Sequence, residues 1–195
     1  MHYLTCTTGD QLKTRHEIIV KASHEMVSAT SRHSATRGLE NVLEGYSNSR
    51  GNRLVLDQLV KAFSRDGADH GFDYAVCHPC SSSYLSSAKD SPLGAAKKRA
   101  EQKVNKYDVA CRNHDIAFNA PVLEVFGAWS DDMVKLAKSC AALVQDSLPD
   151  GTTTTWTADS FSAYHQQRIG IALQRANAKA IRLRAARDYW DLGLG

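Results

Sequence analysis

The sequence predicts an α/β fold in which a small central mixed sheet is flanked by helices and a basic helix ends the chain. Two short runs rich in β-branched and aromatic residues, 54–63 and 72–78, predict neighbouring strands. Apolar residues at helical spacing before and after these runs predict the flanking helices. The chain has 195 residues, 43% of them hydrophobic, which is enough to build one hydrophobic core.

The composition leaves the class of partner open. The formal net charge of +3 permits a polyanionic partner without indicating one. The five cysteines are irregularly spaced, so the disulfide framework of a small secreted protein is not predicted. No apolar run approaches the roughly 18 residues that cross a membrane, and none follows Met1 as in a signal peptide. We therefore expect a soluble protein with no membrane partner.

The expected elements follow the order helix, strand, strand, helix, strand, helix, helix. Helices are predicted at 11–36, 95–111, from 131 onward and at 160–188, and strands at 54–63, 72–78 and 116–126. Loops are predicted at 44–51, 65–71 and 81–92, and a low-complexity linker at 152–155. Pro121 places the third strand at a sheet edge or implies a bulge. Ser130 is expected to cap the next helix, whose predicted core face is Met133, Leu136, Cys140 and Val144.

Asp57 and Asp73 would each lie on one arm of an antiparallel hairpin formed by the first two strands. Apolar neighbours surround both acids, and a buried carboxylate needs a partner. A hard cation such as magnesium is a suitable partner, and a divalent ion held by carboxylates is the usual centre of metal-dependent phosphodiester hydrolysis. The alternative is that both acids point into solvent from an ordinary hairpin.

Five segments, in order along the chain, resemble the PD-(D/E)XK, or restriction-like, endonuclease region of non-LTR retrotransposon reverse-transcriptase polyproteins. The segments are RLVLDQLV at 53–60, FDYAVCHP at 72–79, GAAKKRA and KVNKY within 94–107, PVLEVFGAW at 121–129 and YHQQRIGIALQRANA at 164–178. The resemblance implies a restriction-endonuclease-like fold and magnesium-dependent nicking of double-stranded DNA, with Asp57 and Asp73 as metal ligands. The sequence departs from the family pattern at Leu56, where proline is expected, and at Ala75, where a standard member carries lysine.

The missing lysine is expected on the following helix, where this branch of the family looks to carry it in a Lys-x-x-Lys-Tyr segment. Around that helix Lys103 falls about 20° outside the edge of the apolar stripe that runs from Ala96 to Val104, and Lys106 about 80° outside it. Lys103 is therefore the predicted third catalytic residue, with its stem along the core. The alternative is a solvated basic face made of Lys97, Lys98, Lys103 and Lys106.

Further metal ligands are less well defined. Glu124, on the third predicted strand, either joins the magnesium site or faces solvent. His2 and Cys6 resemble the second half of the Cys-x-x-Cys and His-x-x-x-Cys element that precedes this nuclease in related polyproteins. They could bind zinc only if an upstream Cys-x-x-Cys completed the four ligands. Cys77 and Cys80 share a Cys-x-x-Cys spacing and are interpreted as incidental thiols at a strand end.

The resemblance divides the chain into a remnant of the zinc-knuckle-like element at 1–10, an endonuclease-like domain at 11–150, and a linker with the basic helix at 151–195. The resemblance thus implies a fragment that starts inside the ancestral zinc element. Arg15 and His16 also resemble a recurrent family element, for which an N-terminal helix pair capping the sheet is the plainer explanation.

Cations on the last helix are expected to bind a nucleic-acid backbone. Arg168, Arg175, Lys179 and Arg182 step by seven, four and three residues and share one face, with Gln174 nearby and Lys106 contributing from the earlier helix. The alternative is a solvated outer face of a helix that packs through Ile169, Leu173, Ala176 and Ala180.

The predicted function is a retrotransposon-derived, metal-dependent DNA endonuclease that nicks its target. Double-stranded DNA is the expected partner, element RNA a second one, and the nucleus the expected location. One alternative is a non-catalytic nucleic-acid-binding remnant, and another is a purely structural product with no affinity for nucleic acid. The composition does not discriminate among the three.

Overall fold

The computed structural model describes residues 11–147 and 160–191, and the side chains of residues 12–146 and 160–186. Within these ranges the fold is mixed α/β, as the sequence predicted. The helices are α2 (Gln11–Ser28), α3 (Leu85–Asp90), α4 (Gly94–Arg112), α5 (Asp131–Ser147) and α6 (Phe161–Asp191). The strands are β1 (Ser34–Ala35), β2 (Gln58–Val60), β3 (Asp69–Phe72), β4 (Ala75–Cys77), β5 (Ile116–Asn119) and β6 (Val122–Glu124). His2, Cys6 and the predicted linker at 152–155 lie outside the described residues.

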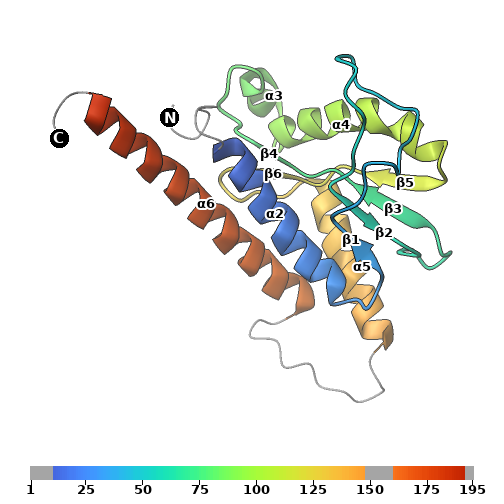
Figure 1. The fold of residues 1–195 in the computed structure, drawn as a ribbon. Helices are drawn as coiled ribbons and strands as arrows, with labels where there is room; N and C mark the ends of the chain where they lie inside the picture. Colours follow the sequence, from blue (N-terminus) through green and yellow to red (C-terminus); the bar gives the residue numbers. More distant parts are fainter. Residues whose placement is uncertain (1–10, 148–159, 192–195) are drawn as a thin grey trace.

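The strands form a four-stranded mixed sheet, in the order β1, β2, β3, β5, and a two-stranded parallel sheet of β4 and β6. Helix α4 covers one side of this layer, and α2, α5 and α6 lie on the other, with α6 running alongside α2 (Figure 1). Leu59 packs toward α4 and its neighbour Val60 toward the three-helix side, because successive strand residues point to opposite faces.

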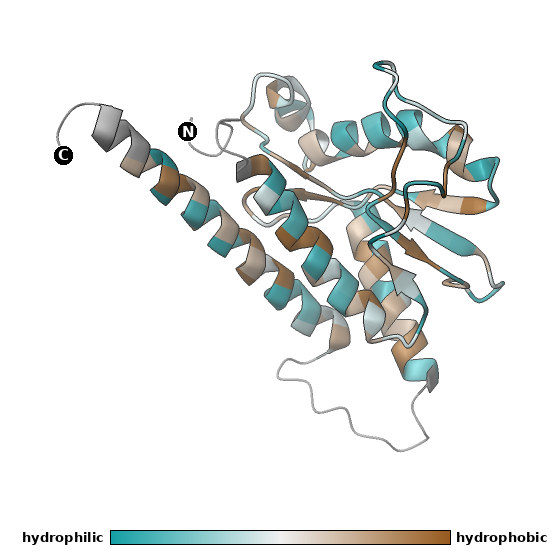
Figure 2. Ribbon diagram, in the orientation of Figure 1, coloured by the Kyte–Doolittle hydropathy of each residue, from teal (hydrophilic) through white to brown (hydrophobic). Residues whose placement is uncertain are grey.

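The larger core lies between the four-stranded sheet and helices α2, α5 and α6. It includes Ile19 and Met26 of α2, Phe72 of β3, and Ile169 and Leu173 of α6. Helix α5 is largely hydrophobic, whereas α4 is mostly hydrophilic along its exposed side (Figure 2). Helix α6 is therefore part of the main core rather than an appendage to it.

Strands β2 and β3 form the predicted antiparallel pair, with Gln58 opposite Phe72 and Val60 opposite His70. Both strands have different bounds from those expected. Strand β2 ends at Val60 because the chain turns at Ala62, whose φ is 48°. Strand β3 begins inside the predicted loop 65–71 and ends before Asp73. The two acids thus lie just outside the strands, at the same end of the pair.

The two long strands predicted at 72–78 and 116–126 are each divided between the two sheets. Strand β3 pairs with β5 in parallel, and β4 pairs with β6 in parallel at the same sequence offset. The amides of Asp73 and Ala75 donate to the carbonyls of Asn119 and Pro121, at 3.3 and 3.1 Å. The alternating bond of a parallel ladder would come from the amide of Pro121, which carries no hydrogen. The ladder is therefore interrupted beside Asp73.

Three other boundaries or caps are informative. Helix α2 ends at Ser28 rather than near residue 36, because the chain turns through Ser31 at a φ of 58° to enter β1. The predicted serine-rich loop 81–92 contains helix α3. The predicted cap of α5 is confirmed, since the amide of Met133 donates to the hydroxyl of Ser130, and all four residues of its predicted core face are buried. None of the described helices is long and apolar enough to cross a membrane.

Candidate active site

The hairpin register brings Asp57 and Asp73 to the same place. Gln58 is paired with Phe72. The amide of Asp57 donates to the carbonyl of the same Phe72 at 3.0 Å, so Asp57 and Gln58 both lie opposite one residue, as in a β-bulge. The Asp57 carboxylate accepts a hydrogen bond from the amide of Tyr74, the residue after Asp73, and the charge of Asp57 raises the pKa of Asp73. The two carboxylates therefore lie close together at the open end of the hairpin.

The Asp57 carboxylate is held by two donors. Its Oδ2 atom accepts a hydrogen bond of 2.7 Å from the amide of Tyr74 and lies 2.9 Å from Nε2 of His16, on helix α2. The side chain is 19% exposed, so solvent reaches it. The hydrogen bond to Asp57 is the largest influence on His16 and raises its pKa, and the charge of Asp73 acts in the same direction. His16 is therefore part of this site.

Asp73 is the more deeply buried acid, with a side chain that is 5% exposed. Burial raises its pKa, and the charge of Asp57 raises it further, while an ion pair with Lys103 opposes both effects. A buried carboxylate beside a second carboxylate is unfavourable in its charged form. Acids perturbed in this way by burial and a specific charged neighbour are concentrated at functional sites.

Lys103 reaches the site from α4, and its side chain is only 13% exposed. The apolar stripe of α4 differs from the predicted one, because Val104 at one edge is 38% exposed while Ala110, beyond the other edge on the side of Lys103, is buried. The buried face is therefore rotated toward Lys103. Lys103 lies closer to the core than its sequence position suggested, and the structure brings it to Asp73.

Tyr107 and Lys106 border the site on the same helix. The Tyr107 hydroxyl donates to the carbonyl of Val55 at 3.1 Å, and burial raises its pKa, as does the adjacent Asp73. The ammonium of Lys106 lies 2.9 Å from this hydroxyl and 4.4 Å from the centre of the Tyr107 ring. Burial lowers the pKa of Lys106, although the charge of Asp73 opposes that effect. The cation is thus at the margin of the acid pair.

Behind the acids, a buried hydrogen-bond network joins α2 to the sheet. The Tyr74 hydroxyl donates to Oε1 of Gln58 at 2.5 Å, and Nε2 of Gln58 donates to Oγ of Ser34 at 2.7 Å. His24 of α2 lies 2.9 Å from the same Ser34 oxygen. Gln58 and Tyr74 are fully buried. Since Tyr74 also donates its amide to Asp57, the network fixes the backbone that positions this carboxylate.

A groove of about 800 Å³ opens on Asp57 between α2 and the segment that follows β1. His16 and His24 line it from the helix, and Leu56 lines it from the segment before β2. Asp57 is the acid of the pair that reaches this groove, whereas Asp73 lies behind it against α4. A substrate would therefore approach the acid pair from the Asp57 side.

The residues fit a magnesium ion held by few protein ligands. Among the described residues no group of three or more His, Cys, Asp or Glu side chains is arranged to hold a metal. Two neighbouring carboxylates remain, and magnesium commonly uses one or two carboxylates, completing its shell with water and substrate phosphate. The acid pair thus offers as many carboxylates as such a magnesium ion uses.

Glu124 is not brought to the acid pair. Glu124 is paired with Cys77. By the same sequence offset Ala120 lies opposite Asp73, so Glu124 is four residues farther along its strand than the position beside Asp73. Four residues of strand span about 13 Å. Its carboxylate instead accepts a hydrogen bond from the amide of Ala96 in the first turn of α4, although burial raises the Glu124 pKa. The expectation that Glu124 contributes a third metal ligand conflicts with this position.

The cysteines of the Cys-x-x-Cys spacing differ in environment. Cys77 ends β4 and is buried, and burial raises the pKa of its thiol to about 12. Cys80 follows the strand and is exposed. The predicted zinc-element residues, His2 and Cys6, are outside the described residues.

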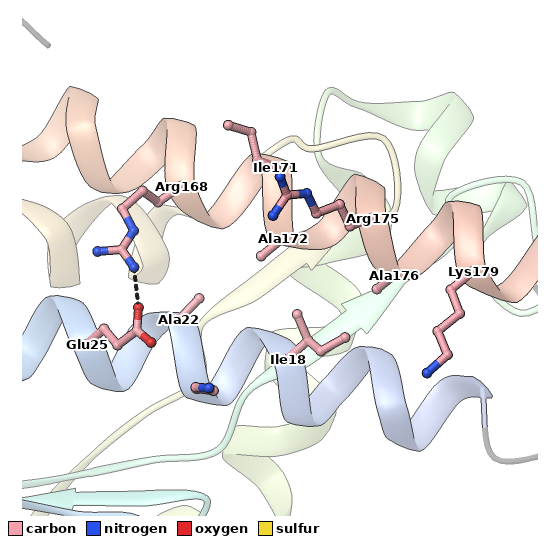
Figure 3. Close-up of a pocket in the computed structure, with 10 residues that line it drawn as sticks. Ile18, Ala22, Glu25, Arg168, Ile171, Ala172, Arg175, Ala176 and Lys179 are labelled. Atoms are coloured by element: carbon pink, nitrogen blue, oxygen red, sulfur yellow. Dashed lines mark hydrogen bonds and ion pairs between the residues drawn. The ribbon is translucent and has the colours of Figure 1, made fainter. Parts of the chain in front are cut away.

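The cations of α6 do not all have the same surroundings. Arg168 forms an ion pair of 2.5 Å with Glu25 of α2, and Arg175 and Lys179 line a groove between the two helices (Figure 3). Arg182 is exposed farther along α6. Gln174 is not free beside them, because its amide donates to the carbonyl of Val125 at 3.4 Å. The predicted packing face of Ile169, Leu173, Ala176 and Ala180 is buried throughout.

Two residues of this site were not among those predicted for it, His16 and Tyr107. The Arg15-His16 pair offered a signal, since it resembles a recurrent family element, although its plain explanation was a helix capping the sheet. Comparisons with known proteins add no assignment: no family model matches the sequence, and a search of curated proteins finds no significant match.

Proposed function

We propose that this chain is a metal-dependent endonuclease of restriction-endonuclease-like fold that nicks double-stranded DNA and derives from a non-LTR retrotransposon. The observation that carries the proposal is the convergence of Asp57, Asp73 and Lys103 at the end of one hairpin. The two arms of the hairpin and helix α4 contribute these charges. A buried acid with a raised pKa is costly to keep, and catalysis is a reason to retain it.

The proposed roles follow from the contacts of each group. A bound divalent ion would polarise the scissile phosphate and supply hydroxide. Asp57 and Asp73 would hold that ion, with the Oδ2 atom of Asp57 fixed by Tyr74 and His16. Lys103, beside Asp73, would direct its ammonium at the charge that develops on the phosphate. In an intact element such a nick would prime reverse transcription in the nucleus, with element RNA as a second ligand.

A second candidate is a non-catalytic nucleic-acid-binding remnant of the same element. One observation favours it: Glu124, a possible third acidic ligand, lies near the first turn of α4 instead of beside Asp57. In this alternative the scaffold and its cations persist after cleavage is lost.

Nicking of supercoiled plasmid separates the two candidates. With magnesium, wild-type protein should convert supercoiled plasmid to the open circle, and chelation should stop the reaction. Asp73→Asn should nick at least about a hundredfold more slowly, because a lost metal ligand costs more than the 10–100-fold typical of an outer partner. Asp69→Asn, at the opposite end of β3, is the matched control and should nick normally. Equal background nicking by the wild type and Asp73→Asn would favour the remnant.

A further inference from the structure

The groove that opens on Asp57 is lined by several cationic side chains that form no ion pair with Asp57 or Asp73. Lys13 and Lys21 line it from α2, and Arg37 lines it from the segment after β1. Lys21 and Arg37 are exposed, and neither has an acidic partner within ion-pair distance in the described part of the chain. Lys13 lies 3.9 Å from Glu17, but both side chains are mostly exposed, so this pair is weak.

The spacing of these cations suits a nucleic-acid backbone. Lys13 and Lys21 are eight residues apart on one helix, which is about 12 Å along its axis. A duplex presents phosphates on each strand at about 3.4 Å of axial rise, so the two lysines span three to four base-pair steps. Arg37 faces them from the far wall of the groove. Phosphates on both sides of Asp57 would therefore have a cation within reach.

Lys21 connects this groove to a second one. It also lines the groove of about 610 Å³ between α2 and α6, together with Arg175 and Lys179. The side chain of Lys179 extends from α6 toward α2 (Figure 3). Arg168, the remaining cation of α6 in this groove, is paired with Glu25. The cations that lack an acidic partner among the described residues thus extend from the acid pair around α2 to α6.

We infer that the groove on Asp57 binds the sugar-phosphate backbone of duplex DNA through Lys21 and Arg37. The bound backbone continues past Lys21 to contact Arg175 and Lys179. The inference rests on the proposed nuclease function for the identity of the nucleic acid. It assigns the main backbone contacts to α2 and the segment after β1, with α6 as their extension. Few apolar residues line the groove, and Val20 and Leu56 are among them, so an apolar peptide is a poor fit.

The test measures binding of a fluorescent DNA duplex by anisotropy over a series of salt concentrations, without divalent metal. Lys21→Gln/Arg37→Gln should weaken binding and reduce the slope of log K against log salt by about 2, since each lost phosphate contact removes about 1. The matched control is Lys89→Gln/Lys138→Gln, which also removes two exposed positive charges, neither of them lining these grooves. Its slope should equal that of the wild type, and thermal unfolding should show that both variants remain folded.

Two results would overturn the inference. One is an equal change of slope in both double variants, which would show that only net charge matters. The other is equal competition by polyglutamate and by unlabelled duplex DNA, which would indicate an acidic-peptide surface instead. Failure of the proposed function is distinguishable: a wild type that binds through Lys21 and Arg37 but nicks no DNA with any divalent metal would refute the nuclease and leave this groove assignment in place.

Discussion

Strand β3 has a carboxylate at each end, and the two have opposite surroundings. Asp69, its first residue, accepts hydrogen bonds from Lys61 at 2.5 Å and from the amide of Ala62 at 2.9 Å, and these lower its pKa. Asp73, which follows its last residue, is buried beside Asp57, and its pKa is raised. The surroundings of Asp69 favour its charge, whereas those of Asp73 disfavour it.

This contrast separates a structural acid from a candidate functional one. Asp69 closes the turn between β2 and β3, and its charge stabilises the folded state. Asp73 retains its charge only at a cost that Lys103 offsets in part. Proteins commonly keep such unfavourable groups where activity requires them. The following predictions test whether the two ends of β3 differ in this way.

The largest expected effect on stability comes from removing the cation beside each acid. Lys103→Met should lower the free energy of unfolding by about 3–5 kcal/mol, because it leaves a buried carboxylate without its partner. Lys61→Met should cost at most about 1 kcal/mol, because that pair is largely exposed; Lys61 is 54% exposed and Lys103 13%. Urea denaturation measures both values. Similar losses for the two variants would mean that the Asp73 ion pair is no more buried in solution than the Asp69 pair.

A smaller effect is expected from the hydrogen bond that anchors the segment after Asp73. Tyr74→Phe removes the donor to Oε1 of the fully buried Gln58, and an unsatisfied buried acceptor costs about 1–3 kcal/mol. The control is Tyr84→Phe, whose hydroxyl donates to Gln102 at an exposed site. It should change stability by no more than about 0.5 kcal/mol. If denaturant unfolding gave the same small loss for both, the buried network would not be what holds this end of β3.

The smallest effect is a change in the pH dependence of stability, opposite in sign for the two acids. Because the pKa of Asp73 is raised in the folded state, protonated Asp73 stabilises the fold at pH values below 3.8, its ordinary pKa. This stabilisation is lost as the pH rises through the folded-state pKa. Asp73→Asn should therefore gain stability relative to the wild type as pH rises. The lowered pKa of Asp69 gives a contribution present above 3.8 and lost as pH falls. Asp69→Asn should therefore be less stable than the wild type at neutral pH, and the gap should close in acid.

Denaturant unfolding of the wild type and both asparagine variants between acid and neutral pH measures these slopes. The test depends on whether stability rises or falls with pH in each variant relative to the wild type. Because both substitutions keep the shape of the side chain, this difference reports the lost charge rather than changed packing. Parallel curves for the two variants would contradict the assignment of opposite environments to Asp69 and Asp73.

Much of the candidate site followed from local patterns in the sequence. Asp57 and Asp73 each lie in a run of residues predicted to form a strand, and the antiparallel pairing of β2 with β3 brings them close together. Lys103 could be chosen over Lys106 because helical periodicity fixes directions around α4. The same reasoning misjudged Val104, which is 38% exposed, because the stripe of a helix is defined by what packs on it.

The remaining features depend on how distant elements pack together. His16 lies 41 residues before Asp57 in the chain, and although a helix capping the sheet was expected at Arg15 and His16, neither segment specifies that α2 crosses this end of the hairpin. The place of Glu124 depends on its position along the ladder, which a predicted strand at 116–126 does not specify. The proline in that strand was a usable signal, although it separates two sheets where a bulge or an edge was expected.

The β3–β5 and β4–β6 pairs, on either side of the interruption at Pro121, have the same sequence offset. This common offset limits the insertions and deletions that the protein can tolerate. Ala75 and Cys77 of β4 are buried while Val76 between them is half-buried, and a shift of one residue exchanges the two faces of a strand. Deleting or inserting a single residue between Asp73 and Ala75 would therefore exchange the buried and the half-buried positions of β4. The side chains of the second sheet would then no longer match the faces of the first. Homologues should therefore vary in length at the turn near Gly67 or around Gly51 while keeping the segment from Asp69 to Cys77 at constant length.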